Sequence, residues 1–123
     1  MRGDRVTRGF YRLLLSSLAL KGGFIFMTKE AAYQSKLVKR IKDRFPGSIV
    51  MKTDPTQRQG IPDLLILHED KWASLEVKRS EKAPRRPNQE YYVDKLNKMS
   101  FSSFIFPENE EEVLNAMERS FES

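Results

Sequence analysis

The sequence predicts an α/β protein in which a central mixed β-sheet is flanked by helices. Three stretches lead to this prediction. Residues 28–45 carry apolar side chains at helical spacing, residues 63–67 form a short apolar run bounded by breakers, and residues 72–78 alternate between two faces. With the segments that follow, the expected order is helix, three strands, helix, strand, helix.

The first helix and strand are bounded by clear signals. Thr28 is a suitable N-cap, and the inward positions share helical spacing. Pro46-Gly47 ends the helix, and residues 48–53 then read as a strand. The expected inward side chains are Glu30, Gln34, Leu37, Val38, Ile41 and Phe45.

The next two strands are expected to form a hairpin across the polar turn at residues 68–71. A pleated strand of period two turns Glu76 and Lys78 to one face and Ala73, Leu75 and Val77 to the other. In such a hairpin Asp63, at the mouth of the first strand, lies level with Glu76. The three polar groups then converge on one point.

Two carboxylates at close range in a partly dry site repel each other. The repulsion amounts to about 4 kcal/mol at 4 Å for an effective dielectric of about 20. A divalent cation or a raised pKa must relieve it. The Asp63 and Glu76 pair is therefore a candidate metal site or a candidate proton-binding site.

The remaining elements follow a polar, basic loop at residues 79–87. Asn88 is expected to cap a helix through about Met99, with Tyr92, Leu96 and Met99 at core spacing. Residues 102–106 read as a strand and 108–121 as an acidic helix. Further side chains expected in the core are Tyr91, Phe101, Phe104, Phe106, Val113, Leu114 and Met117.

Length and composition narrow the function classes. A chain of 123 residues is expected to form one domain with a modest core. It has no cysteine, which excludes disulfides and thiolate metal sites, and a single histidine, His68, cannot build an imidazole cage. Oxygen ligands favour Mg²⁺ or Mn²⁺. No apolar segment has the length of a membrane span. The apolar run at residues 13–20 is broken by serines and followed by Lys21-Gly22-Gly23, so we expect no export and a cytoplasmic protein of a bacterial or phage-infected cell.

The first 26 residues differ in charge from the rest. Their five basic residues against Asp4 give a net +4, which leaves +1 of the total +5 for residues 27–123. Lys21-Gly22-Gly23 can be encoded by a ribosome-binding sequence, so we expect that residues 1–26 are a translated leader and that the natural start is Met27. A basic DNA-binding arm or a disordered tail are the alternatives. An amino-terminal peptide beginning at Met1, in protein made from the native gene context, would contradict the leader.

The pattern Pro62-Asp63 followed by Glu76-Val77-Lys78 resembles the PD-(D/E)xK nuclease superfamily. The run Gly60-Ile61-Pro62-Asp63-Leu64, with Glu30 and Gln34 upstream and Gln89 downstream, is similar to the VRR-NUC family over roughly residues 28–106. This resemblance implies a restriction-endonuclease-like core of order αβββαβα. It also implies a metal-dependent DNA endonuclease, of the kind found among phage Holliday-junction nucleases.

The same resemblance implies roles for individual residues. Asp63, Glu76 and the main-chain carbonyl of Val77 would hold Mg²⁺ or Mn²⁺. Glu30 would assist, or would only place an acid favourably at a helix N-terminus. Lys78 would orient water or stabilise the transition state, and Gln89 would position water or phosphate.

Cationic residues around this point are candidates for DNA backbone contacts, since phosphates are bound without regard to sequence. A symmetric homodimer would supply two cuts related by a two-fold axis. The alternatives are a non-catalytic DNA-binding module, a nuclease subunit that depends on a partner, and an α/β protein with a coincidental motif. The candidate DNA-binding residues are Lys52, Arg58, Arg79, Lys82, Arg85 and Arg86.

Overall fold

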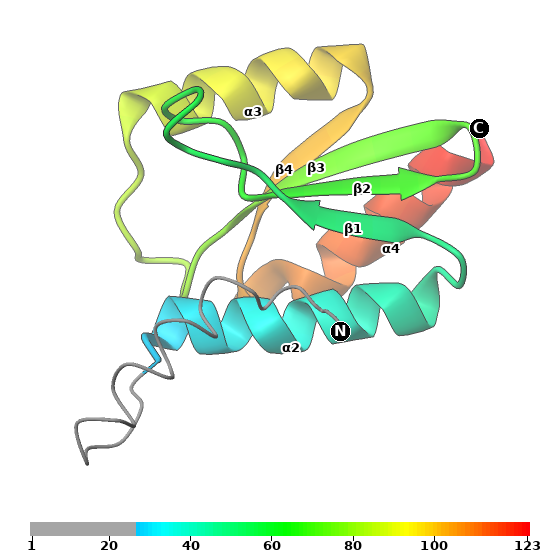
Figure 1. The fold of residues 1–123 in the computed structure, drawn as a ribbon, viewed down its shortest axis with the longest axis horizontal. Coiled ribbons are helices and arrows are strands. Elements are labelled where there is room, and N and C mark those ends of the chain that lie inside the picture. The colour runs from blue at the N-terminus through cyan, green and yellow to red at the C-terminus, as the bar shows by residue number, and fades with distance from the viewer. Residues whose placement is uncertain (1–26) are drawn as a thin grey trace.

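A computed structural model describes residues 27–123, so the expectations for residues 1–26 lie outside the described residues. Figure 1 shows one twisted sheet with helices on both sides. No helix of residues 27–123 combines the length and apolar character needed to cross a membrane. The elements are α2 (Lys29–Arg44), β1 (Ile49–Lys52), β2 (Leu64–His68), β3 (Lys71–Val77), α3 (Pro87–Met99), β4 (Phe101–Ile105), a 3-10 turn η1 (Pro107–Asn109) and α4 (Glu110–Glu122).

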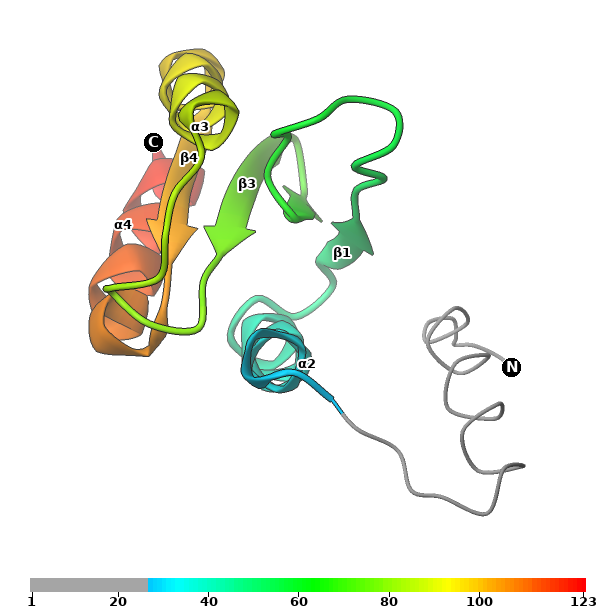
Figure 2. The ribbon, with the colours of Figure 1, turned by 90° about the vertical axis from the view of Figure 1, so that its left-hand side faces the viewer.

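The four strands form one mixed sheet in the order β1-β2-β3-β4. The first three are antiparallel neighbours, whereas β3 and β4 run parallel and are joined by the crossover helix α3 (Figure 2). A crossover is required because parallel neighbours cannot be joined by a tight turn. The predicted element order and the predicted mixed sheet are both confirmed.

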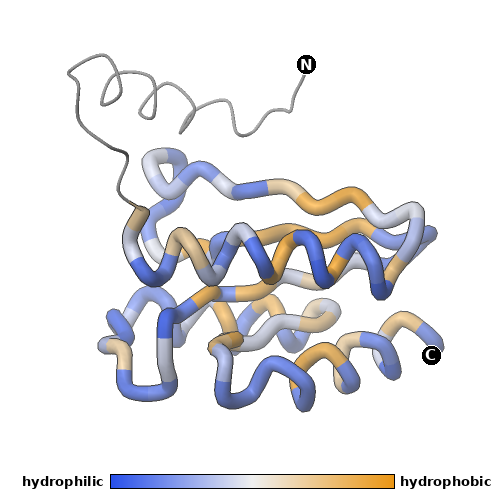
Figure 3. The backbone as a smooth tube through the Cα atoms, turned by 90° about the horizontal axis from the view of Figure 1, so that it is seen from below, coloured by the Kyte–Doolittle hydropathy of each residue, from blue (hydrophilic) through white to orange (hydrophobic). Residues whose placement is uncertain are grey.

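The hydrophobic core lies between the sheet and the helices α2 and α4. Ala73, Leu75 and Val77 face this core from β3, as the alternation predicted. The opposite face of β3 is covered by α3, and Ser74 and Glu76 are therefore buried as well. Figure 3 shows hydrophobic residues along the strands and hydrophilic ones prevailing along α2 where it faces the viewer.

Helices α2 and α4 are also joined by polar contacts. Glu110 accepts two hydrogen bonds from the Arg40 guanidinium and one from the Tyr33 hydroxyl, the latter at 2.8 Å. Arg44 forms an ion pair with Glu118 at 2.7 Å. These groups hold the two helices side by side where they cover the sheet.

Helix α3 ends at Met99, as predicted, but begins earlier than predicted. Its first residue is Pro87 and its N-cap is Arg86, two residues before the predicted cap Asn88. Proline is favoured there because its fixed φ suits the first helical position and its missing N–H would have no partner in any case.

Two side chains of α3 do not reach the core. Tyr91 is 57% exposed and Met99 is 65% exposed, so both predictions of burial are wrong. The helix contacts β4 and β3 through one side only, and no residue of α3 is fully buried. Tyr92 and Leu96 are half-buried on that side.

Candidate active site

Asp63 occupies the position immediately before β2. The antiparallel register pairs Leu64 with Leu75, so the next position on each strand places Asp63 opposite Glu76. The backbone N–H of Val77 donates to Asp63 Oδ2 at 2.9 Å, which fixes the carboxylate beside β3. The hairpin therefore brings the two acids together as its alternation predicted.

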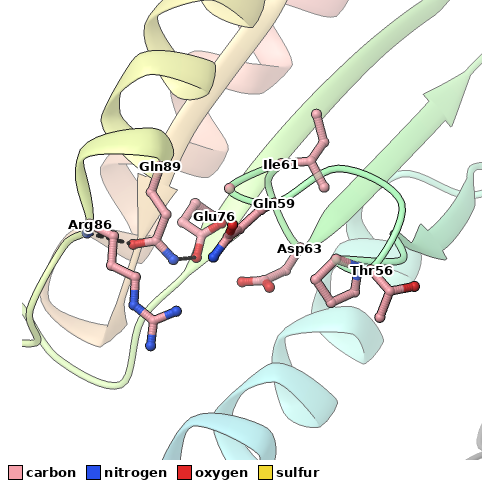
Figure 4. Close-up of a pocket in the computed structure, with 9 residues that line it drawn as sticks. Thr56, Gln59, Ile61, Asp63, Glu76, Arg86 and Gln89 are labelled. Atoms are coloured by element: carbon pink, nitrogen blue, oxygen red, sulfur yellow. Dashed lines mark hydrogen bonds between the residues drawn. The ribbon is translucent and has the colours of Figure 1, made fainter.

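Glu76 and Lys78 stand on the face of the sheet covered by α3. Their exposed fractions are 3% and 7%, and Lys78 Nζ lies 3.9 Å from Glu76 Oε2. Both side chains meet Gln89 in the first turn of α3. Its Nε2 donates to Glu76 Oε2 at 3.0 Å (Figure 4). Its Oε1 accepts from Lys78 Nζ at 2.9 Å.

The Gln89 amide is itself held by the helix cap. The backbone N–H of Arg86 donates to the same Oε1 atom at 3.0 Å. Because Oε1 receives two donors and Nε2 faces a carboxylate, the orientation of the amide is fixed by its partners. Gln89 thus connects the acid and the lysine of β3 to the start of α3.

Burial, and next the charge of Asp63, raise the pKa of Glu76 to about 8 against the opposing charge of Lys78. The pKa of Asp63 is also raised, chiefly by burial, and the N–H of Val77 counteracts this. The two carboxyl groups lie close enough for each to affect the pKa of the other. The site is therefore short of positive charge and takes up a proton, or a cation, readily.

Glu30 lines the same region from the first turn of α2. Its pKa is raised, chiefly by burial and next by the charge of Asp63. The charges of Lys78 and Arg79 offset part of this rise. Among residues 27–123, no group of three His, Cys, Asp or Glu side chains is arranged as a metal cluster. The structure thus pairs Asp63 and Glu76 closely and leaves Glu30 as a third acid on the wall.

Two adjoining hollows meet at the carboxylate pair. Asp63, Glu76, Arg86 and Gln89 line both of them. The first has a volume of about 310 Å³ and extends along the loop after β3, where it is lined by Glu30, Lys78, Arg79, Ala83 and Pro84. The second has a volume of about 440 Å³ and extends along the loop before β2, where it is lined by Pro55, Thr56, Gln59, Gly60 and Ile61.

The six predicted DNA-binding residues are not all placed at the site. Arg79 and Arg86 line the hollows. Lys52 lies at the end of β1, and its charge offsets part of the rise in the pKa of Asp63.

The other three cations lie elsewhere. Arg58 donates to the Tyr92 hydroxyl at 3.1 Å, and the Arg85 guanidinium lies 4.0 Å from the centroid of the Phe104 ring. Lys82 is exposed and lines neither hollow. Arg58 and Arg85 thus have contacts within the protein that account for their positions.

The loop before β2 contributes side chains that the sequence did not single out, chiefly Thr56, Gln59 and Ile61. The glycine at position 60 is the feature of the sequence that could have indicated this arrangement. Its φ is +91°, and a Cβ built on it would lie 2.5 Å from Asn88 Cβ. A glycine is needed there because the loop touches the start of α3, and this contact places the preceding residues on the wall of the site.

Comparisons with known proteins give one informative match. No family model matches the chain, and no curated protein matches it. Among solved structures, a chain described as "VRR_NUC domain" is 30% identical; the match covers 65% of this chain and 85% of that chain, with a TM-score of 0.49. The identity and coverage establish the relationship, and with it the restriction-endonuclease-like fold that the motif implied. The chain belongs to the VRR-NUC family of nuclease domains.

Proposed function

We propose that this protein is a metal-dependent DNA endonuclease that hydrolyses phosphodiester bonds and prefers branched DNA. One observation carries the proposal. Asp63, Glu76, Lys78 and Gln89 form a single connected group at a polar hollow in a chain of a nuclease family.

The residues of the hollow fit a divalent cation. The half-buried Asp63 and the buried Glu76 form a hard oxygen donor set with raised pKa values, which suits Mg²⁺ or Mn²⁺ in place of a proton. Asp63 and Glu76 would hold the ion, with the Val77 carbonyl as a third oxygen and Glu30 in support. When bound, such an ion lowers the pKa of water and offsets the charge of a phosphate.

The side chains around the acids would do the remaining work. Lys78 places a cation beside the pair, where it would stabilise the negative charge that develops on the phosphate during hydrolysis. Gln89 would hold Lys78 and Glu76 in place through its amide. Arg79 and Arg86, on the walls of the hollows, would contact the phosphates on either side.

Affinity for DNA would come from more than one copy. Residues 27–123 have a net charge of only +1, so one domain neutralises few phosphates and binds DNA weakly. A homodimer would double the contacts and would supply two symmetric cuts at a four-way junction.

The test is cleavage of a labelled four-way junction, a flap, a linear duplex and single-stranded DNA, with Mg²⁺, Mn²⁺ or EDTA. We expect metal-dependent cuts at the branched substrates. Asp63→Ala, Glu76→Ala and Lys78→Ala should abolish them with little loss of fold by circular dichroism. Lys98→Ala, which changes an exposed lysine at the end of α3 outside both hollows, is the matched control. Cleavage at the wild-type rate by any of the three site variants would refute the assignment.

A second outcome is equally informative. If the wild-type protein binds DNA in a salt-sensitive manner and cuts none of the four substrates, it is a DNA-binding module or a subunit that requires a partner.

A further inference from the structure

The two hollows at the carboxylate pair differ in chemistry. The hollow along the loop after β3 has the cationic side chains of Lys78 and Arg79 together with Glu30, which suits charged groups. Beyond the four residues that both hollows share, the hollow along the loop before β2 has an amide, Gln59, and apolar surface from Pro55 and Ile61. Such a lining suits a flat, largely uncharged group that carries hydrogen-bonding edges.

Gln59 is the residue that gives the second hollow this character. Figure 4 shows its amide end directed into the hollow, toward Glu76 and Asp63. The Gln59 side chain makes no hydrogen bond to any part of the chain that the structure describes. Both the donor and the acceptor of the amide are therefore free for a ligand.

The wall that presents Gln59 is held in place on both sides. Arg58 donates to the Tyr92 hydroxyl of α3 at 3.1 Å, and Gly60 packs directly against Asn88. The loop is therefore tied to the same helix that supplies Gln89. A side chain presented by a fixed loop loses less conformational entropy on binding than one on a free loop.

We propose that the hollow of Pro55, Thr56, Gln59 and Ile61 receives a nucleobase, namely the base of a nucleotide adjoining the phosphate that is cut. This inference rests on the proposed nuclease function and names the feature of DNA that the site selects. The phosphate lies at Asp63 and Glu76, the Gln59 amide contacts the edge of the base, and Pro55 and Ile61 contact its apolar surface. A volume of about 440 Å³ lies within the range that binds small organic ligands, and it is large enough for one base.

The consequence is a physical origin for structure selectivity. In a continuous duplex each base is paired and stacked, so a base enters the hollow only after it is extruded, at a cost in free energy. That cost is smallest where a base is already unpaired, as at a branch point or a single-strand junction. The site then favours such positions without reading a sequence at every base pair.

The experiment is a comparison of base removal with side-chain removal. The cut position is first mapped on a flap substrate with wild-type protein and Mg²⁺. Each nucleotide that flanks the cut is then replaced, one at a time, by an abasic residue. We expect a loss of at least about tenfold in kcat/KM at one of the two positions, because a well-placed base contact contributes discrimination of that order.

Gln59→Ala should reduce cleavage of the intact flap to a similar extent, and should cause little further loss on the abasic flap, because both changes remove one contact. Gln57→Ala is the matched control, since Gln57 is exposed on the same loop and does not line the hollow. A melting temperature for each variant separates loss of contact from loss of fold.

The outcomes separate this inference from the proposed function. Cleavage by the wild-type protein that is unaffected by an abasic residue at either position overturns the base subsite and leaves the nuclease intact. The base subsite is also overturned if the loss from Gln59→Ala and the loss from the abasic residue multiply when the two changes are combined, because the changes then remove different contacts. No cleavage by the wild-type protein removes both proposals together.

Discussion

The Gln89 side chain accepts a hydrogen bond from Lys78 Nζ at 2.9 Å, across the boundary between α3 and the sheet. Through its other end the same amide donates to Glu76. The lysine and the acid that lie two residues apart on β3 are thus held by a residue from another element. Their positions depend on where α3 begins.

Gln89→Ala should therefore reduce cleavage without unfolding the protein. Loss of the amide leaves Lys78 and Glu76 with fewer partners in a buried site, and an interaction of this kind contributes about 1.5 to 3 kcal/mol where a charged group takes part. We expect kcat/KM to fall by about ten- to a hundredfold, measured on the best-cut substrate. Glu90→Ala, which changes an exposed neighbour on α3, is the control. Equal cleavage by the two variants would contradict the role of Gln89.

The raised pKa of Glu76, about 8, predicts how the metal-free protein responds to pH. Because the pKa in the folded state lies above that of the unfolded chain, its contribution to stability is complete at low pH. That contribution is lost as the pH rises from about 4.5 to about 8. The raised pKa of Asp63 acts in the same direction. We expect the melting temperature in EDTA to fall over this window and Mg²⁺ to raise it most at the upper end.

Glu76→Gln tests the origin of this slope. The amide keeps the shape of the side chain and removes the titrating group, so the melting temperature should depend less on pH than in the wild-type protein. Glu112→Gln, on the exposed side of α4, is the control and should leave the slope unchanged. A wild-type slope in Glu76→Gln would mean that another group is responsible.

The hairpin could be predicted from the sequence because two signals agreed. The period-two pattern of residues 72–78 determined the face of Glu76, and the polar turn at residues 68–71 determined the register that sets Asp63 opposite it. The structure has a two-residue turn, Glu69-Asp70, within that segment.

The placement of α3 could not be predicted in the same way. Its apolar residues do not mark one narrow stripe, and Tyr91 and Tyr92 are adjacent in sequence although one is exposed and the other half-buried. Which side of the helix faces the sheet follows from its crossover between β3 and β4 and from contacts distant in sequence. The bond from Arg58 to Tyr92 and the bridge made by Gln89 depend on that rotation, and no local pattern encodes it.

Tyr33→Phe should lower stability and leave the site unaffected. The change removes the hydroxyl that donates to Glu110 at 2.8 Å between α2 and α4, while both Arg40 bonds remain. One such bond contributes about 1 kcal/mol, so the free energy of unfolding in urea should fall by about that amount. Tyr91→Phe is the control, because Tyr91 is exposed. A change of the same size in the control would contradict the role of the Tyr33 hydroxyl.

Gly60→Ala should damage both stability and cleavage, and Gly47 provides a matched comparison. The two glycines have φ values of +91° and +87°, so an alanine at either position is strained, by about 1 to 3 kcal/mol. Only at position 60 would the added Cβ meet another element, since Asn88 Cβ lies 2.5 Å away and nothing lies within 4 Å of the corresponding atom at position 47.

The difference between the two variants therefore measures the contact of the loop with α3. We expect Gly60→Ala to unfold at a lower urea concentration than Gly47→Ala. It should also cut more slowly at temperatures where both remain folded, because the loop is pushed away from the helix that supplies Gln89. Equal stability and equal cleavage would mean that this contact does not shape the site.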